Sequence, residues 1–211
     1  MATIVQDTFT GTNGTNLSSH TPDVNVPGNS WVAVNGNYTI SSNQALAGNG
    51  VAQEIESIDC ANADVTITLD VAIPSGSSNV QGIAMRVTDQ NNCWACFHEN
   101  DGGSNGYLAI AERASGSTFT RASANFSGTT AGTTMTLTAT SSGSTITVAS
   151  TAAGPGTLSY GSATAEQTVT KHGLFGYTAS GYTTGLMDNL LVTGTTAAVI
   201  LPPNLFMQGA A

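Results

Sequence analysis

Positive charge is scarce in this chain of 211 residues. Lys and Arg number 4 against 13 Asp and Glu, which gives a net charge of −9 at pH 7. Four cations cannot neutralise a run of phosphates, so nucleic-acid binding through a basic surface is excluded. A polybasic contact with an anionic membrane is excluded for the same reason. We therefore expect neither nucleic acid nor a membrane among the partners.

Long apolar runs and cysteines are also scarce. No stretch approaches the roughly 20 apolar residues of a membrane span. The first residues lack the basic start and apolar stretch of a secretory signal. Cys60, Cys93 and Cys96 are an odd number and cannot all pair within one chain. A small and odd number of cysteines is typical of a protein that is made and folded in a reducing cytoplasm.

The abundant residues are those that favour β-structure. Thr, Val, Ile and the 24 Gly are common, whereas Glu, Lys, Arg and Leu are few. The low charge alone would suit a disordered chain, but such chains are usually poor in β-branched residues and rich in charge. Here 40% of the residues are hydrophobic and the mean hydropathy is +0.04. The composition predicts an all-β protein.

Alternation of apolar and polar residues marks the expected strands. In residues 63–73 the five apolar side chains at odd positions 65–73 share one face. In residues 81–87 we expect Ile83, Met85 and Val87 on one side and Arg86 on the other. Two hairpins are expected, at 92–99 with 106–112 and at 134–140 with 144–150, and further strands at 5–10, 31–34, 38–41, 51–55, 169–177 and 186–192. The total is about a dozen strands, without an amphipathic helix.

Three segments carry a resemblance to a known superfamily. They are 7–15 (DTFTGTNGT) followed by Leu17, His20 and Trp31; 82–89 (GIAMRVTD); and 173–177 (GLFGY) followed by 187–192 (MDNLLV). In order and spacing the chain resembles the concanavalin A-like (laminin G-like) jelly rolls, most closely the divergent versions in structural proteins of tailed phages. The resemblance implies one two-sheet antiparallel jelly-roll sandwich over residues 1–194, with the closing strand next to the opening one.

Residues 195–211 differ in kind from the sandwich. They carry no charge, are mostly apolar and contain two prolines, so they suit neither a helix nor a central strand. They either fold back on the sandwich or form an extended C-terminal arm on a partner subunit. We expect the arm, because an uncovered apolar segment would promote aggregation. Its expected partner-binding residues are Val199, Ile200, Leu201, Pro202, Leu205, Phe206 and Met207.

The resemblance implies a non-enzymatic virion structural protein. The expected role is a capsid decoration (cement) protein of a tailed phage, made in the host cytoplasm and displayed on the capsid surface. Its expected partners are the major capsid protein or sister subunits in a homo-oligomer. The alternative is a lectin-like glycan-binding module of a phage fibre or host-contact protein.

Two groups of residues resemble chemical sites but fit a structural role better. Glu54, Glu56 and Asp59 resemble the carboxylates of jelly-roll glycoside hydrolases, but their order departs from that pattern. We expect them instead on a polar outer face, with no catalytic residue in the chain. Cys93 and Cys96 with His98 suggest half of a zinc site. On a strand, however, positions 93 and 96 point to opposite faces, so we expect buried cysteines.

Two binding predictions remain, for a metal and for a sugar. No cofactor is required, but concanavalin A-like domains often bind structural calcium, here at Asp7, Asp188 and Asn189. A second oxygen-rich group is Asp89, Asn91, Asn92, Asp101 and Asn105, and turn capping by Asx side chains is the alternative for both groups. The aromatic pool for sugar binding is Trp31, Trp94, Tyr107, Phe119, Tyr160, Tyr177 and Tyr182. Tyr182, in a Gly- and Thr-rich loop, is the expected glycan contact.

Overall fold

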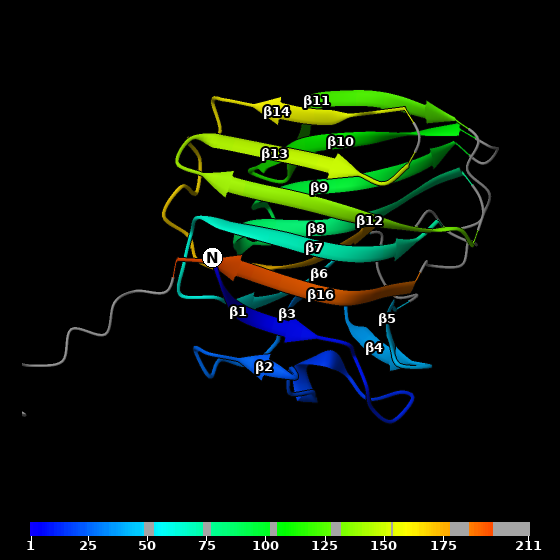
Figure 1. Ribbon diagram of the computed structural model, residues 1–211, viewed down its shortest axis with the longest axis vertical. Helices are drawn as coiled ribbons and strands as arrows, with labels where there is room; N and C mark the ends of the chain where they lie inside the picture. The colour runs from blue at the N-terminus through cyan, green and yellow to red at the C-terminus, as the bar shows by residue number, and fades with distance from the viewer. Residues whose placement is uncertain are drawn as a thin grey trace, which may run out of the picture.

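The computed structural model describes residues 1–48, 53–73, 77–101, 105–127, 132–152, 154–177 and 186–195. Within them the chain forms a sandwich of two antiparallel sheets (Figure 1), which confirms the predicted all-β jelly roll. Among these residues the only helical element is a 3-10 turn, η1 (Leu17–Ser19). No helix in this part of the chain is long and apolar enough to cross a membrane.

The first sheet has nine strands. Its main path, in spatial order, is β14 (Thr157–Tyr160), β13 (Thr145–Ser150), β12 (Thr134–Ser142), β7 (Val65–Ala72), β16 (Leu186–Gly194), β1 (Ala2–Asp7) and β2 (Val24–Asn25). The short strand β5 (Gln44–Ala47) pairs with β16, and β4 (Tyr38–Ser41) pairs with β5. The pairing of β1 with β16 confirms that the closing strand lies next to the opening one.

The second sheet has seven strands. In spatial order they are β11 (Ser117–Ser127), β10 (Asn105–Ala114), β9 (Asn92–Asp101), β8 (Ser77–Asp89), β15 (Lys171–Tyr177), β6 (Gln53–Asp59) and β3 (Val32–Asn35). We call the face of this sheet that packs on the first sheet its inner face, and the opposite one its outer face. The end where β15 finishes and β10 begins is called the Tyr177 end.

The main core lies between the two sheets. On β7 burial alternates along the strand, with Val65, Ile67, Leu69 and Val71 pointing inward as predicted. They pack against inner-face side chains of the second sheet such as Ile83. A one-residue slip would turn every inward side chain of β7 to solvent, so the hydrophobic pattern fixes its register.

The prediction for Val87 is wrong. Ile83 and Met85 point inward, but Val87 packs in the outer-face cluster. The cause is a bulge: Arg86 has a φ of +51°, and the β8–β9 register shifts between Met85 and Asp89. An extra residue in one strand reverses the side-chain alternation beyond it. Arg86 is consequently buried, although it was expected opposite the apolar side.

Candidate glycan-binding site

A row of aromatic and polar side chains crosses the outer face at the Tyr177 end. Strand register places the five residues directly opposite one another on neighbouring strands, in the order Tyr177, Val80, Glu99, Tyr107 and Asn125. We call these five residues the outer row. Strands lie about 4.8 Å apart, so Tyr177 and Tyr107 are separated by three steps, or about 14 Å.

The outer row stands beside a packed aromatic base. Phe97 and Phe175 stack with ring centroids 5.8 Å apart, and Tyr107 meets Phe97 edge-on at 6.4 Å. The two phenylalanines are almost fully buried, whereas Tyr177 is 39% exposed and Tyr107 is half-buried. The phenylalanines therefore support the sheet, and the two tyrosines present ring surface to solvent.

Tyr107 is oriented by a neighbouring carboxylate. Its hydroxyl donates a short hydrogen bond to Oε2 of Glu99, on the adjacent strand. Burial and the Glu99 charge raise the pKa of Tyr107 above its ordinary value, so the phenol stays protonated and keeps donating. Glu99 is only half-buried. Its carboxylate can therefore accept further hydrogen bonds from a ligand hydroxyl.

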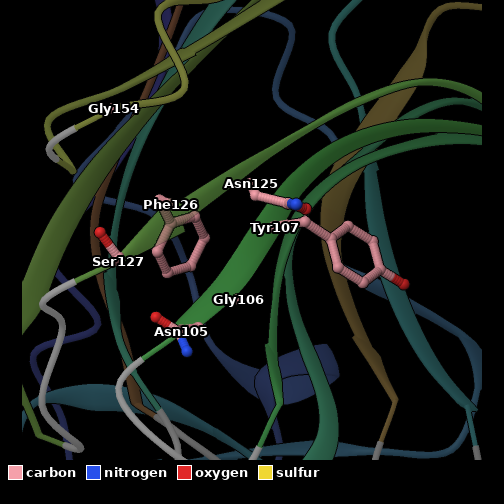
Figure 2. A pocket seen from close by; sticks show the side chains of 7 residues that line it. All are labelled: Asn105, Gly106, Tyr107, Asn125, Phe126, Ser127 and Gly154. Atoms are coloured by element: carbon pink, nitrogen blue, oxygen red, sulfur yellow. The ribbon is translucent and has the colours of Figure 1, made fainter.

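A pocket of about 460 Å³ adjoins the β11 end of the outer row. Its lining residues are Asn105, Gly106, Tyr107, Asn125, Phe126, Ser127 and Gly154. Figure 2 shows Tyr107 and Phe126 pointing to different sides of the β10–β11 hairpin, with the Asn125 side chain lying toward Tyr107. A Cβ at Gly106 would lie 2.7 Å from the Phe126 ring and 2.2 Å from the Glu99 carbonyl oxygen, so this position requires glycine.

The pocket combines the two kinds of group that small-molecule sites use. Tyr107 supplies ring surface, and Phe126, which is 4% exposed, closes the pocket from the side opposite Tyr107. Asn105, Asn125 and Ser127 supply hydrogen-bond donors and acceptors. Neutral amides and hydroxyls both donate and accept. The site is therefore suited to a ligand rich in hydroxyl groups.

Several predicted site residues lie outside the described part of the chain. Tyr182 falls in 178–185, and all seven expected arm contacts, from Val199 to Met207, fall in 196–211. From the rest of the aromatic pool, Trp31 and Trp94 are buried in the core. Phe119 is 45% exposed and carries the Arg121 guanidinium 5.1 Å from its ring centroid.

The carboxylates of β6 do not lie where they were expected. Glu54 and Glu56 were predicted on an outer polar face, but both point inward and are 2% and 0% exposed. A β-strand places alternate residues on one face, and this face of β6 belongs to the core side. Asp59 sits at the far end of the strand, where it accepts hydrogen bonds from Thr170 and Ala61. These carboxylates do not flank a site that a polysaccharide can enter.

The cysteine prediction is confirmed. Cys93 packs in the outer-face cluster and Cys96 in the main core, so the two point to opposite faces. All three cysteines are free and buried, and burial raises their pKa values to about 12. Among the described residues there is no group of three or more His, Cys, Asp or Glu side chains that could hold a metal ion.

The residues of the calcium prediction have other contacts. Both oxygens of Asp7 accept hydrogen bonds, from the Trp31 indole at 2.9 Å and from the Phe9 amide at 2.8 Å, and its Oδ1 also lies 2.9 Å from His20 Nε2. Asp188 and Asn189 lie on β16, where the Asn189 amide donates to Asp70.

The second oxygen-rich group is not gathered in one place. Asp89 caps the β8–β9 turn by accepting from the Asn91 backbone and the Asn92 side chain. Asn105 lies at the Tyr177 end, remote from that turn. For Asp89 the structure therefore shows the Asx-capping alternative, and calcium stays a prediction.

No known protein-family model matches this sequence, and no curated protein is significantly similar to it. Solved structures share the fold. The carbohydrate-binding module CBM66 from Bacillus subtilis has a TM-score of 0.56 at 13% identity, over 78% of this chain and 95% of that one. The exoplasmic/lumenal domain of VIP36, in a form bound to Ca²⁺ and Man3GlcNAc, has a TM-score of 0.53 at 9% identity, over 81% and 88%.

An enzyme shares the fold over part of its length. GH43B of the Bacteroides ovatus xyloglucan PUL has a TM-score of 0.54 at 15% identity, over 91% of this chain. The chain spans only 38% of that protein. At these identities the comparisons establish the jelly-roll sandwich fold alone. The function has to be argued from the residues of the site.

Proposed function

We propose that this chain is a non-catalytic carbohydrate-binding domain, a divergent concanavalin A-like module that holds an oligosaccharide across its outer face. The outer row carries the proposal. Two partly exposed tyrosines about 14 Å apart bracket a carboxylate, and an amide-lined pocket continues the row. Sugar rings present C–H faces that pack on aromatic rings, and their hydroxyls bond to amides and carboxylates.

The charge distribution favours a neutral glycan. Glu99 lies in the middle of the outer row, whereas Lys171 and Arg113 lie at the opposite ends of their strands. Arg86 is buried by the β8 bulge and Arg121 pairs with Glu112. With a net charge of −9, the surface repels uronic, sialylated or phosphorylated sugars.

The structure also supports a binding rather than a hydrolytic role. Glycoside cleavage needs two carboxylates that flank the scissile bond. Glu54 and Glu56 are enclosed between the sheets, and Glu99 is bonded to a phenol instead of a second carboxylate. The outer row therefore provides a platform and hydrogen bonds, without an acid and a nucleophile.

A glycan array followed by calorimetry on the best neutral oligosaccharide tests the proposal. We expect saturable binding that Tyr107→Ala and Tyr177→Ala each weaken roughly tenfold, since an aromatic contact contributes about 1.4 kcal/mol. Tyr107→Phe retains the ring but loses the hydrogen bond to Glu99, so its effect should be smaller. Phe119→Ala is the matched control, because Phe119 is at 45% at least as exposed as Tyr177 and lies beside Arg121, away from the outer row.

Two outcomes would contradict the proposal. One is an array of plant, bacterial and animal glycans without any saturable ligand. The other is a ligand whose affinity falls as much in Phe119→Ala as in Tyr107→Ala. A ligand that is exclusively anionic would leave glycan binding in place and reject only the neutral class.

The capsid-decoration role is compatible with a glycan-binding face. It rests on the resemblance to phage structural proteins and on the uncharged residues 195–211, with the major capsid protein or sister subunits as partners. Of that segment the structure describes Thr195, whose carbonyl accepts a hydrogen bond from Asn62 at 2.9 Å. The role stays a prediction, and truncation of the arm tests it.

A further inference from the structure

A second group of polar side chains lies inside the sandwich at the Tyr177 end. On the inner face of the second sheet, Glu54 of β6, Gly176 of β15 and Gln81 of β8 lie directly opposite one another. Glu54 and Gln81 are each 2% exposed. Gly176 between them has no side chain, so the register leaves a space flanked by a carboxylate and an amide.

The hydroxyl of Tyr38 fills part of that space from the first sheet. A Cβ on Gly176 would lie only 2.7 Å from this hydroxyl oxygen. Tyr38 is fully buried, and its hydroxyl has no hydrogen-bond partner. The phenol therefore points between Glu54 and Gln81 and contributes a third oxygen to the group.

Glu56 adds a second carboxylate. It lies two residues from Glu54 on the same face of β6, and its Oε2 accepts the Tyr38 backbone N–H at 3.3 Å. Glu56 Oε1 and Gln81 Oε1 are both buried without a partner. Three orphan oxygens in one interior group are costly, because each has lost its water without gaining a donor.

The chain's own cations do not compensate the buried Glu56 carboxylate. All four Lys and Arg side chains have their contacts elsewhere. Arg86 contacts Asp64 and the carbonyls of Gly143 and Ala163, and Arg113 contacts Gln90 and Thr118. Arg121 contacts Glu112, and Lys171 lies beside Asp59 at the far end of β15 from Tyr177. A buried carboxylate such as Glu56, whose Oε1 has no hydrogen-bond partner and which has no counter-charge, is either protonated or bound to a cation.

We propose that Tyr38, Glu54, Glu56 and Gln81 bind one hard divalent cation, Ca²⁺, inside the sandwich. Two carboxylates balance its charge, and the phenol and amide supply neutral oxygens of the kind that such cations prefer. The group is separate from Asp7 and from the outer row. It contains only two acidic side chains, so it depends on the neutral oxygens to complete the coordination.

Terbium luminescence reads this site directly, because Tb³⁺ replaces Ca²⁺ and is excited by a nearby phenol. Full-length protein is treated with EDTA and titrated with Tb³⁺ under tyrosine excitation. We expect one bound ion per chain and displacement by Ca²⁺. Tyr38→Phe should lose most of the sensitised emission while the protein still takes up Ca²⁺ by calorimetry.

Charge-removing variants locate the ion. Glu56→Gln retains an acceptor for the Tyr38 N–H, so it should fold, yet it should bind Ca²⁺ roughly tenfold more weakly or worse, since ligand charge tunes calcium affinity. Glu54→Gln should act alike. The control is Glu112→Gln, which removes a carboxylate that pairs with Arg121 outside the group. Ca²⁺ should raise the melting temperature of wild type and of Glu112→Gln, and leave Glu56→Gln unchanged.

Two results would overturn the proposal. In one, EDTA-treated protein takes up neither ion, and Glu56→Gln is as stable as wild type or more so, which shows a protonated acid in place of a metal ligand. In the other, Ca²⁺ binds wild type, Glu54→Gln and Glu56→Gln equally, which places the ion elsewhere.

Discussion

At the scale of single residues, two buried histidines link stability to pH. Burial lowers the pKa values of His98 and His172 to about 4. Nδ1 of His172 accepts a hydrogen bond from the backbone N–H of Arg86, and Nε2 lies 3.0 Å from the Asn62 carbonyl oxygen. This arrangement requires the neutral ring, because Nδ1 must carry no proton. The unfolded chain, with ordinary histidines near 6.5, binds protons first as the pH falls.

Stability should therefore decline between about pH 6.5 and pH 4, by on the order of 3 kcal/mol for each histidine. Urea unfolding of wild type and His98→Gln at a series of pH values isolates one of them. The contribution of the carboxylates to the free energy of unfolding is the same in both proteins and cancels in the difference between them. That difference should become smaller as the pH falls. Parallel stability curves across this range would show that His98 is not buried in its neutral form.

The sequence supplied the aromatic residues of the site but not their arrangement. Tyr107 and Tyr177 both belong to the aromatic pool, but the sequence points to Tyr182 as the glycan contact because Tyr182 lies in a Gly- and Thr-rich loop. Whether a strand aromatic faces the core or solvent depends on its register against neighbouring strands. Tyr107 and Tyr177 are 70 positions apart and meet in one row only through the pairings of β8, β9, β10 and β15.

At the scale of elements, the Arg86 side chain ties the β8 bulge to neighbouring segments of the sandwich. Arg86 donates to the carbonyls of Gly143 at 2.6 Å and Ala163 at 3.2 Å, and pairs with Asp64 at 3.3 Å. Arg86→Met should lower the free energy of unfolding by about 2–4 kcal/mol, because it leaves buried acceptors without donors. Chemical denaturation measures the loss.

Arg113→Met is the control for that variant. Arg113 donates to the Gln90 carbonyl at an exposed site, so its removal should change the stability by less than about 1 kcal/mol. Equal losses in the two variants would mean that Arg86 contributes no more than an ordinary surface arginine.

Strands with strict alternation were predictable, and irregular or polar ones were not. β7, β9, β10, β12 and β13 follow the expected ranges, since one of their faces is apolar. β11 and β14 lie at sheet edges with mostly exposed or half-buried residues, so neither shows a clear apolar face. Glu54 and Glu56 were misplaced because polar residues normally mark the solvent face, whereas here they cluster in the interior.

At the scale of the whole molecule, the proposed glycan site and the C-terminal end of β16 lie at opposite ends of the sandwich. The outer row and its pocket occupy the Tyr177 end. β16 runs the other way and finishes at Gly194, opposite Ala2 and Val65. Thr195 then contacts Asn62, whose carbonyl lies 3.0 Å from the ring of His172 near the start of β15. Thr195, the last residue that the structure describes, thus lies at the end remote from the proposed glycan site.

Deletion of residues 196–211 should separate assembly from glycan binding. The truncated chain keeps every described strand, so its melting temperature and its affinity for the neutral ligand should match the full chain. If the deleted segment is a docking arm, the truncated protein should no longer form the homo-oligomer or decorate shells, as sedimentation and co-assembly with capsids would show. Normal assembly without these residues would reject the arm. A drop in melting temperature with unchanged assembly would instead show that the segment folds back on its own sandwich, because its apolar side chains then stabilise the chain that carries them.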